Sequence, residues 1–166
     1  MDVMTLTRAD GRNTQLTVDS IVKIRGLLEF ERRLHAASTW IDCGIILYVR
    51  ETPEEVAACL KPAPGRLRRF GRLIAPNGLP VWFQGRLARG PLPVSALDRK
   101  NGIMSALAIA GQTQFVRNSA EEVQALIDAL GGKALTVTRE MPQTLSGGGA
   151  IEMPARLSWE ALPPIG

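Results

Sequence analysis

The sequence predicts an α+β protein in which two tandem β-rich modules pack as a pseudo-symmetric pair, followed by an extended C-terminal tail. Three observations predict this fold class: an internal repeat without gaps, a hairpin-turn dipeptide in each copy, and a helix-start motif in each copy. With 166 residues, the chain is long enough for one ordinary core or two small ones. Its 45% hydrophobic and 22% charged residues are typical of a globular protein.

The internal repeat has a period of 67 residues. At this offset residues 5–60 align with residues 72–127 without an insertion or deletion. The matches gather where a fold needs particular residues, at turns and at helix starts. Identical residues include Gly11/Gly78, Gly44/Gly111, Arg50/Arg117 and Val56/Val123. A tandem duplication explains this pattern, so each element expected in one copy is expected again in the other.

Each copy is expected to begin with a β-hairpin. The dipeptides Asp10-Gly11 and Asn77-Gly78 lie between short apolar runs, VMTLT and TQLTV in the first copy, RLIA and PVWFQ in the second. Tight primed turns need positive φ, which Gly and Asn tolerate. Two further strands follow in each copy, within residues 39–50 and 106–117, and each pair is broken at a glycine.

A capped helix is expected to close each copy. In the motifs YVRETPEEV and FVRNSAEEV, the hydroxyls of Thr52 and Ser119 can accept from the first free backbone N–H groups. Glu55 and Glu122, three residues later, can complete a capping box, and Pro53 suits the first helical position. The repeated phrase is therefore interpreted as a strand followed by a capped helix.

The paired glutamates of these motifs could instead act as acid–base carboxylates. Adjacent helical residues point about 100° apart, however, and capping already explains why the glutamates occupy the first turn. His35 is the single histidine, and the SGGGA run at 146–150 lacks the lysine of a phosphate loop. We therefore expect no catalytic residue, no enzyme activity and no cofactor.

A charged element is also repeated between the strands. FERR at 30–33 aligns with LDRK at 97–100. In the first copy, Leu27, Phe30 and Leu34 fall on one helical face, whereas prolines and an Asn-Gly pair argue against a long helix in the second. Two interpretations stay open: a duplicated basic ligand site, or an exposed connection whose charges solvate the module.

The basic charge is concentrated in the middle of the chain. The net charge is +4, and no Asp or Glu occurs from Val56 to Leu97. Such a stretch can meet phosphates or an acidic partner surface, or it can be a solvated linker. Phe70, Trp82 and Phe83 lie near it and could stack on bases. The candidate partner-binding or nucleic-acid-binding residues are Arg66, Arg68, Arg69, Arg72, Arg86, Arg89, Arg99 and Lys100.

The chain divides into four segments. The first module covers residues 1–62, a basic linker 63–71, the second module with an extra strand (ALTVT, 134–138) residues 72–140, and the tail 141–166. The tail is rich in Pro and Gly, yet it contains more apolar residues than a flexible linker without a binding role would need. It could dock on a partner, on another copy or on its own body through Leu157, Trp159, Leu162 and Ile165.

Cysteine usage and hydropathy bear on the compartment. Cys43 and Cys59 form no CxxC pair and no metal-ligand spacing, so no metal site is expected. No window approaches the roughly 18 apolar residues of a membrane span, and the N-terminus lacks the basic and apolar runs of a signal peptide. We expect a cytoplasmic protein that does not bind membranes and has no evident small-molecule substrate.

The order MTLTRADGRNTQLT, IVKI and TWIDCGIILYVRETPEEVAACL resembles the small flagellar-operon proteins linked to swarming motility, the FlbD/SwrD-like proteins. In that family an Asn-Gly or Asp-Gly hairpin is followed by a strand ending in Glu-Ser/Thr-x-Glu-Glu-Val and a helix. The likeness covers each copy separately, residues 4–60 and 73–127. The chain differs in its duplication, its longer middle connection and its tail. The resemblance implies a non-enzymatic accessory role and assigns no functional residue.

Two function classes follow. The first is a non-catalytic interaction or assembly protein that binds a protein partner or itself and uses its tail as a docking element. The second is a nucleic-acid-binding protein that uses the acid-free stretch, whose binding would collapse between about 50 and 200 mM salt. No known reading helix, RNA-binding sheet motif or zinc finger occurs in the sequence.

Overall fold

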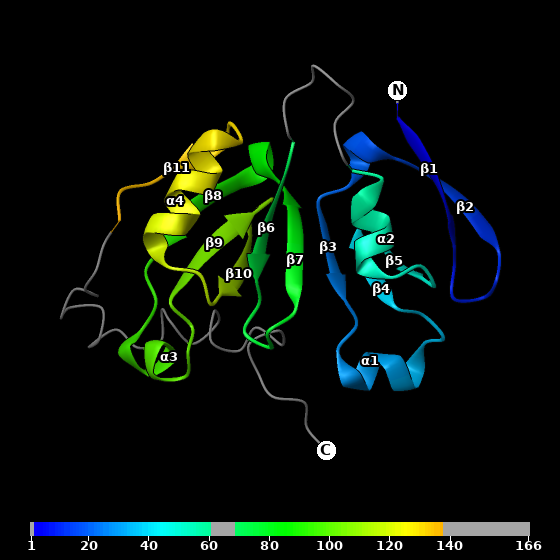
Figure 1. Cartoon of the computed structure of the whole chain (residues 1–166), viewed down its shortest axis with the longest axis horizontal. Helices are drawn as coiled ribbons and strands as arrows, with labels where there is room; N and C mark the ends of the chain where they lie inside the picture. The colour runs from blue at the N-terminus through cyan, green and yellow to red at the C-terminus, as the bar shows by residue number, and fades with distance from the viewer. Residues whose placement is uncertain (1, 61–68, 138–166) are drawn as a thin grey trace.

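A computed structural model describes residues 2–60, here called repeat 1, and residues 69–137, called repeat 2 (Figure 1). Its mixture of helices and antiparallel strands confirms the α+β class. The elements of repeat 1 are β1 (Val3–Thr7), β2 (Asn13–Thr17), the short 3-10 helix η1 (Val18–Ser20), β3 (Lys23–Gly26), α1 (Glu29–Leu34), β4 (Thr39–Asp42), β5 (Ile46–Val49) and α2 (Pro53–Ala58).

Repeat 2 contains the same elements in the same order, followed by one more strand. They are β6 (Phe70–Ile74), β7 (Pro80–Gln84), η2 (Gly85–Leu87), β8 (Ala88–Leu92), α3 (Ala96–Lys100), β9 (Ser105–Ile109), β10 (Gln112–Val116), α4 (Ala120–Ala129) and β11 (Lys133–Ala134). The bounds of β6, β7 and η2 lie 67 positions after those of β1, β2 and η1, the offset of the sequence repeat.

Both predicted hairpins are confirmed. β1 pairs antiparallel with β2, and β6 with β7. Gly11 and Gly78 have φ values of +87° and +86°, a region that residues with a Cβ rarely adopt, so the turns depend on these glycines. The strand pairs broken at Gly44 and Gly111 are also present, as β4 with β5 and β9 with β10.

The helix caps are confirmed in part. Thr52 Oγ1 accepts from the N–H of Glu55 at 3.2 Å, and Ser119 Oγ accepts from the N–H of Glu122 at 3.2 Å. The expected return bond of the capping box is not formed by Glu122, whose carboxylate instead accepts from Asn118 Nδ2 at 3.0 Å. The hydroxyl alone therefore caps this helix.

The predicted apolar face of α1 is wrong. Leu27 is buried but lies before the helix, while Phe30 and Leu34 are 41% and 74% exposed. The residue that α1 buries is Glu31, because its carboxylate bonds to β3 and to the start of its own helix. Polar pairing, not apolar contact, fixes this short helix.

The strands form a five-stranded sheet (β5-β4-β3-β7-β6), a four-stranded sheet (β10-β9-β8-β11) and the β1-β2 ribbon. Short contacts link them within each repeat. In repeat 1 the N–H of Arg50 donates to Thr7 at 2.8 Å, and in repeat 2 the N–H of Arg117 donates to Ile74 at 2.8 Å. The end of β1 therefore lies beside the end of β5, and the end of β6 beside the end of β10, although these strands belong to separate sheets.

The repeats join where β3 of repeat 1 pairs antiparallel with β7 of repeat 2. These strands are not equivalent, since β7 is the counterpart of β2. The expected pseudo-symmetric pair is not confirmed: the observed contact is head-to-tail. One apolar cluster lies mainly in repeat 1 and includes Phe70, another lies in repeat 2 against Val22, so the two cores meet at the joint.

The extra strand after α4 is shorter than expected. Lys133 and Ala134 pair in parallel with Arg89 and Gly90 of β8, and the N–H of Leu135 donates to the carbonyl of Gly90 at 2.7 Å. The end of the predicted strand, residues 63–68 of the expected basic linker (63–71) and the tail lie outside the described residues, whereas Phe70 and Gly71 of that linker belong to β6. β11 therefore covers the outer edge of β8.

Candidate functional site

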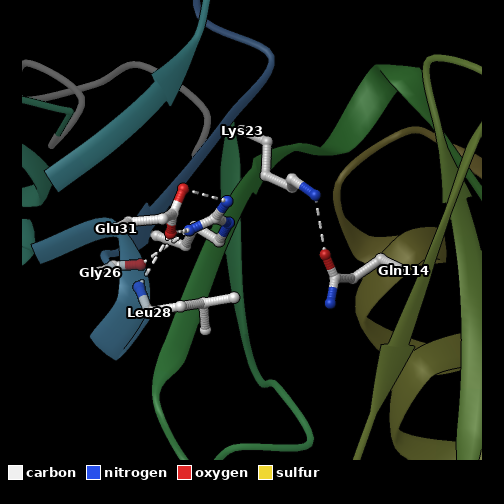
Figure 2. A network of polar contacts seen from close by, with 6 residues as sticks. Lys23, Gly26, Leu28, Glu31 and Gln114 are labelled. Carbon is white, nitrogen blue, oxygen red and sulfur yellow. Dashed lines mark hydrogen bonds and ion pairs between the residues drawn. The ribbon is translucent and has the colours of Figure 1, made fainter. Parts of the chain in front are cut away.

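The joint between the repeats contains a buried ion pair (Figure 2). The side chains of Arg25 and Glu31 are 4% and 5% exposed, and Arg25 Nη1 lies 2.8 Å from Glu31 Oε1. The same Nη1 donates to the carbonyl of Gly26 at 3.0 Å, and Glu31 Oε1 also accepts from the N–H of Leu28 at 2.9 Å. Pairing and hydrogen bonds together offset the cost of burying both charges.

A second buried cation spans the two repeats. Lys23 Nζ on β3 donates to Gln114 Oε1 on β10 at 2.8 Å, and both residues are buried (Figure 2). Trp40 lies beneath both cations, with its ring centroid 5.1 Å from Lys23 Nζ and 4.3 Å from Arg25 Cζ. Cation–π contact adds to the stabilisation of these charges. The network holds β3 in place at the joint.

Tyr48 and His35 extend this polar region toward the surface. Their rings stack with centroids 3.9 Å apart. Burial raises the pKa of the Tyr48 phenol, and the negative charge of Glu31 raises it further, while Arg25 opposes the shift. The tyrosine therefore stays neutral and acts as a hydrogen-bonding group.

An open groove of about 600 Å³ lies beside the joint. Repeat 1 supplies α1, the following loop and the start of α2, and the hairpin of repeat 2 closes one side with Leu79 and Pro80. Arg32, His35 and Glu54 are its main ionisable lining groups besides Arg50. Arg50 already donates to the carbonyl of Ala9 at 3.0 Å, so part of this charge stabilises a turn.

The structure distributes the predicted basic residues over several elements. Arg69 forms an ion pair with Asp19, Arg72 lies 5.9 Å from the Trp82 ring centroid, and Arg86 Nε donates to Gln84 Oε1 at 2.7 Å. Arg89 is exposed on β8. Three of these four arginines thus already have partners within the chain.

The other basic candidates lie elsewhere. Arg99 and Lys100 are on α3, which follows the end of β8, whereas Arg86 and Arg89 lie near its start. Figure 1 places α3 at the lower end of the molecule. Arg66 and Arg68 lie outside the described residues. The six described candidates are therefore spread over η2, the strands β6 and β8, α3 and the residue before β6, and do not belong to one element.

Phe83, expected as a possible base-stacking residue, is fully buried, and so is most of Phe70. Trp82 is half-buried beneath Arg72. The tail candidates Leu157, Trp159, Leu162 and Ile165 lie outside the described residues. Within residues 2–60 and 69–137, no cluster of His, Cys, Asp and Glu could hold a metal ion, and no helix is long and apolar enough to cross a membrane.

The outer edge of β2 is a candidate site that the sequence reasoning missed. Within the described chain β2 pairs with β1 alone. Hydrogen bonds join residue 8 to residue 12 and residue 18 to residue 2, so the even-numbered residues of β2 face β1. By the alternation of an antiparallel ladder, Asn13, Gln15 and Thr17 direct their backbone N–H and C=O groups away from β1.

The equivalent edge in repeat 2 is occupied. Gln84, the counterpart of Thr17, donates its N–H to the carbonyl of Val22 at 2.9 Å. Trp82, the counterpart of Gln15, lies opposite Ile24 of β3. The same strand edge is therefore an interface in repeat 2, whereas in repeat 1 no described residue pairs with it, and Figure 1 shows β2 at the outer side of the molecule.

No family model, no curated protein and no solved structure matches this chain. The geometry of its own two repeats is therefore the basis for assigning a role to the site.

Proposed function

We propose that this protein is a non-enzymatic interaction or assembly protein that binds an extended strand at the open edge of β2. The carrying observation is the β3–β7 joint, in which the counterpart of that edge binds a strand of the neighbouring repeat. Strand addition to an exposed edge is a general mode of protein recognition, because the backbone groups of the edge need partners.

The other features of the chain agree with a binding role. Lys23, Arg25 and Glu31 form paired, buried contacts that fix β3, as expected for a structural joint. The tail at 141–166 is proposed as a further docking element. The resemblance to small flagellar-operon proteins, itself a hypothesis, implies the same class of accessory role. We propose the cytoplasm as its compartment because of the cysteine usage and hydropathy of the chain.

A labelled peptide with the sequence of residues 21–27 tests the proposal. It contains β3, which pairs with β7, and it should bind the full-length protein at β2 with saturable fluorescence anisotropy. Gln15→Pro removes a backbone N–H that points away from β1, and it leaves the backbone hydrogen bonds between β1 and β2 in place. This variant should therefore abolish peptide binding. Unchanged binding by this variant would contradict the proposed site, and so would the absence of binding by the wild type.

The nucleic-acid alternative is tested in the same assay with labelled single-stranded and duplex oligonucleotides at about 50 and 200 mM salt. The assembly proposal expects no tight binding. Salt-dependent binding that disappears when Arg72, Arg86 and Arg89 are all changed to Gln would instead assign function to the basic stretch.

A further inference from the structure

We infer that the occupant of the β2 edge is β2 of a second copy of this chain, paired antiparallel across a two-fold axis with Gln15 opposite Gln15 of that copy. This inference rests on the proposed function and names its partner. A closed dimer is the expected product, because an interface between identical surfaces satisfies both copies at once.

The backbone of β2 fits this register. Gln15 stands at the centre of the strand, and its N–H and C=O groups face outward. Asn13 and Thr17 face the same way at equal distances on either side. With Gln15 opposite its own copy, Asn13 falls opposite Thr17 of the second copy, and each of these pairs can exchange two hydrogen bonds.

The charges around β2 also fit a self-complementary surface. The strand NTQLT contains no charged residue, so identical strands meet without repulsion. Arg12 precedes it and Asp19 follows it, and both residues are exposed. In the antiparallel register Arg12 lies opposite Val18 of the second copy, beside that copy's Asp19. Asp19 already forms an ion pair with Arg69 of its own chain, and Arg12 of the other copy approaches the same carboxylate at each end of the pair.

A head-to-tail chain of molecules is disfavoured by β8, the counterpart of β3. Ile24 pairs with Trp82 at the joint, but the residue 67 positions after Ile24 is Pro91, which has no N–H to donate. The edge of β8 at Arg89 and Gly90 is already covered by β11. Within residues 2–60 and 69–137, the edge of β8 is thus covered by β11, while the outer edge of β2 has no paired strand.

The open end lacks the usual protection of an edge strand. In natural proteins, Lys, Pro or a β-bulge on an edge strand prevents that strand from pairing with another chain. β2 has none of these, and its counterpart β7 begins with Pro80. Because a single strand pair is a small interface, the dimer is expected to be weak and concentration-dependent.

Sedimentation velocity of the full-length protein, from about 10 µM to about 1 mM, tests the inference over the range of weak interfaces. The wild type should shift from one to two chains. Gln15→Lys and Gln15→Glu should each weaken dimerisation at least about fivefold, since like charges then lie opposite each other. Mixing the two variants in equal amounts should restore the dimer. Gln112→Lys, at an exposed strand position in repeat 2, is the matched control and should dimerise like the wild type.

The outcomes separate this inference from the proposed function. A wild type that stays a single chain throughout would overturn the β2 dimer, while peptide binding at β2 would still support the proposed function. A dimer that persists in both Gln15 variants would place the interface elsewhere and also overturn the inference. Restoration by mixing, which only a site facing its own copy predicts, supports it.

Discussion

Arg50 lies over Gly11 of the first hairpin turn, and its Nη2 donates to the carbonyl of Ala9 at 3.0 Å. Repeat 2 has the same arrangement: Arg117 lies over Gly78, and its Nε donates to the carbonyl of Pro76 at 2.9 Å. The arginine and the turn glycine are identical in both copies because they form one contact. This contact attaches the hairpin to the strand that precedes the closing helix.

Replacing either arginine should therefore loosen its hairpin. Arg50→Ala and Arg117→Ala should each lower the free energy of unfolding by about 1 kcal/mol, the usual contribution of one hydrogen bond. Urea denaturation followed by tryptophan fluorescence measures the change. The control is Arg33→Ala, which removes an exposed ion pair with Glu29 and should cost no more than about 0.5 kcal/mol. Equal losses in all three variants would contradict a specific role for the turn contact.

Loss of the bond between the repeats should be more costly. Gln114→Ala leaves the buried Lys23 ammonium without its acceptor on β10, and the free energy of unfolding should fall by about 1–3 kcal/mol. Gln112→Ala, on the same strand but exposed, should change it by less than about 0.5 kcal/mol. If chemical denaturation gives both variants the same midpoint, the bond does not stabilise the joint.

The buried pair of Arg25 and Glu31 should behave non-additively. Glu31→Leu removes the carboxylate that neutralises the buried guanidinium of Arg25 and should cost about 3–5 kcal/mol. The double variant Arg25→Met/Glu31→Leu should be more stable than this single variant, since neither charge of the pair remains buried. A double-mutant cycle by thermal unfolding tests the coupling, and strictly additive losses would show that the two groups act independently.

Tyr48 is the single tyrosine of the chain, so its ionisation can be followed by ultraviolet absorbance. Its pKa should lie above the ordinary value of 10.0 because of burial and then the Glu31 charge. The folded state retains the phenol proton more strongly than the unfolded state. The resulting contribution to the free energy of unfolding is fully present below pH 10 and is lost as the pH rises through the folded pKa. Glu31→Gln should lower the pKa. A phenol that titrates at its ordinary value in the folded wild type would contradict this environment.

Local features of the fold were predictable because neighbouring residues encode them. Asp10-Gly11 and Asn77-Gly78 form the expected turns, and Thr52 and Ser119 cap the expected helices. The prediction for α1 was wrong because periodicity counts apolar residues. It does not reveal that Glu31 finds a buried partner in Arg25, six residues away on another element.

The candidate site was not predictable in the same way. The basic residues lie close together in the sequence, but β8 separates Arg86 from Arg99 in the fold. The open edge of β2 needed two observations that only the structure provides: which residues of the hairpin face outward, and that β3 pairs with β7. Once the joint is known, Pro91 at the position equivalent to Ile24 indicates that β8 cannot pair with another chain as β3 pairs with β7.

The sequence by itself determined the repeat, its hairpin turns and the hydroxyl caps of its closing helices, since these depend on residues close along the chain. Only the tertiary structure decided how the copies join. Pairing of β3 with β7 is a contact between segments about 60 residues apart. Such pairing depends on which strand edges remain open after each hairpin has formed, and on whether Lys23, Arg25 and Glu31 find partners when buried. Both conditions depend on contacts between distant segments, so they can be judged only in the folded molecule.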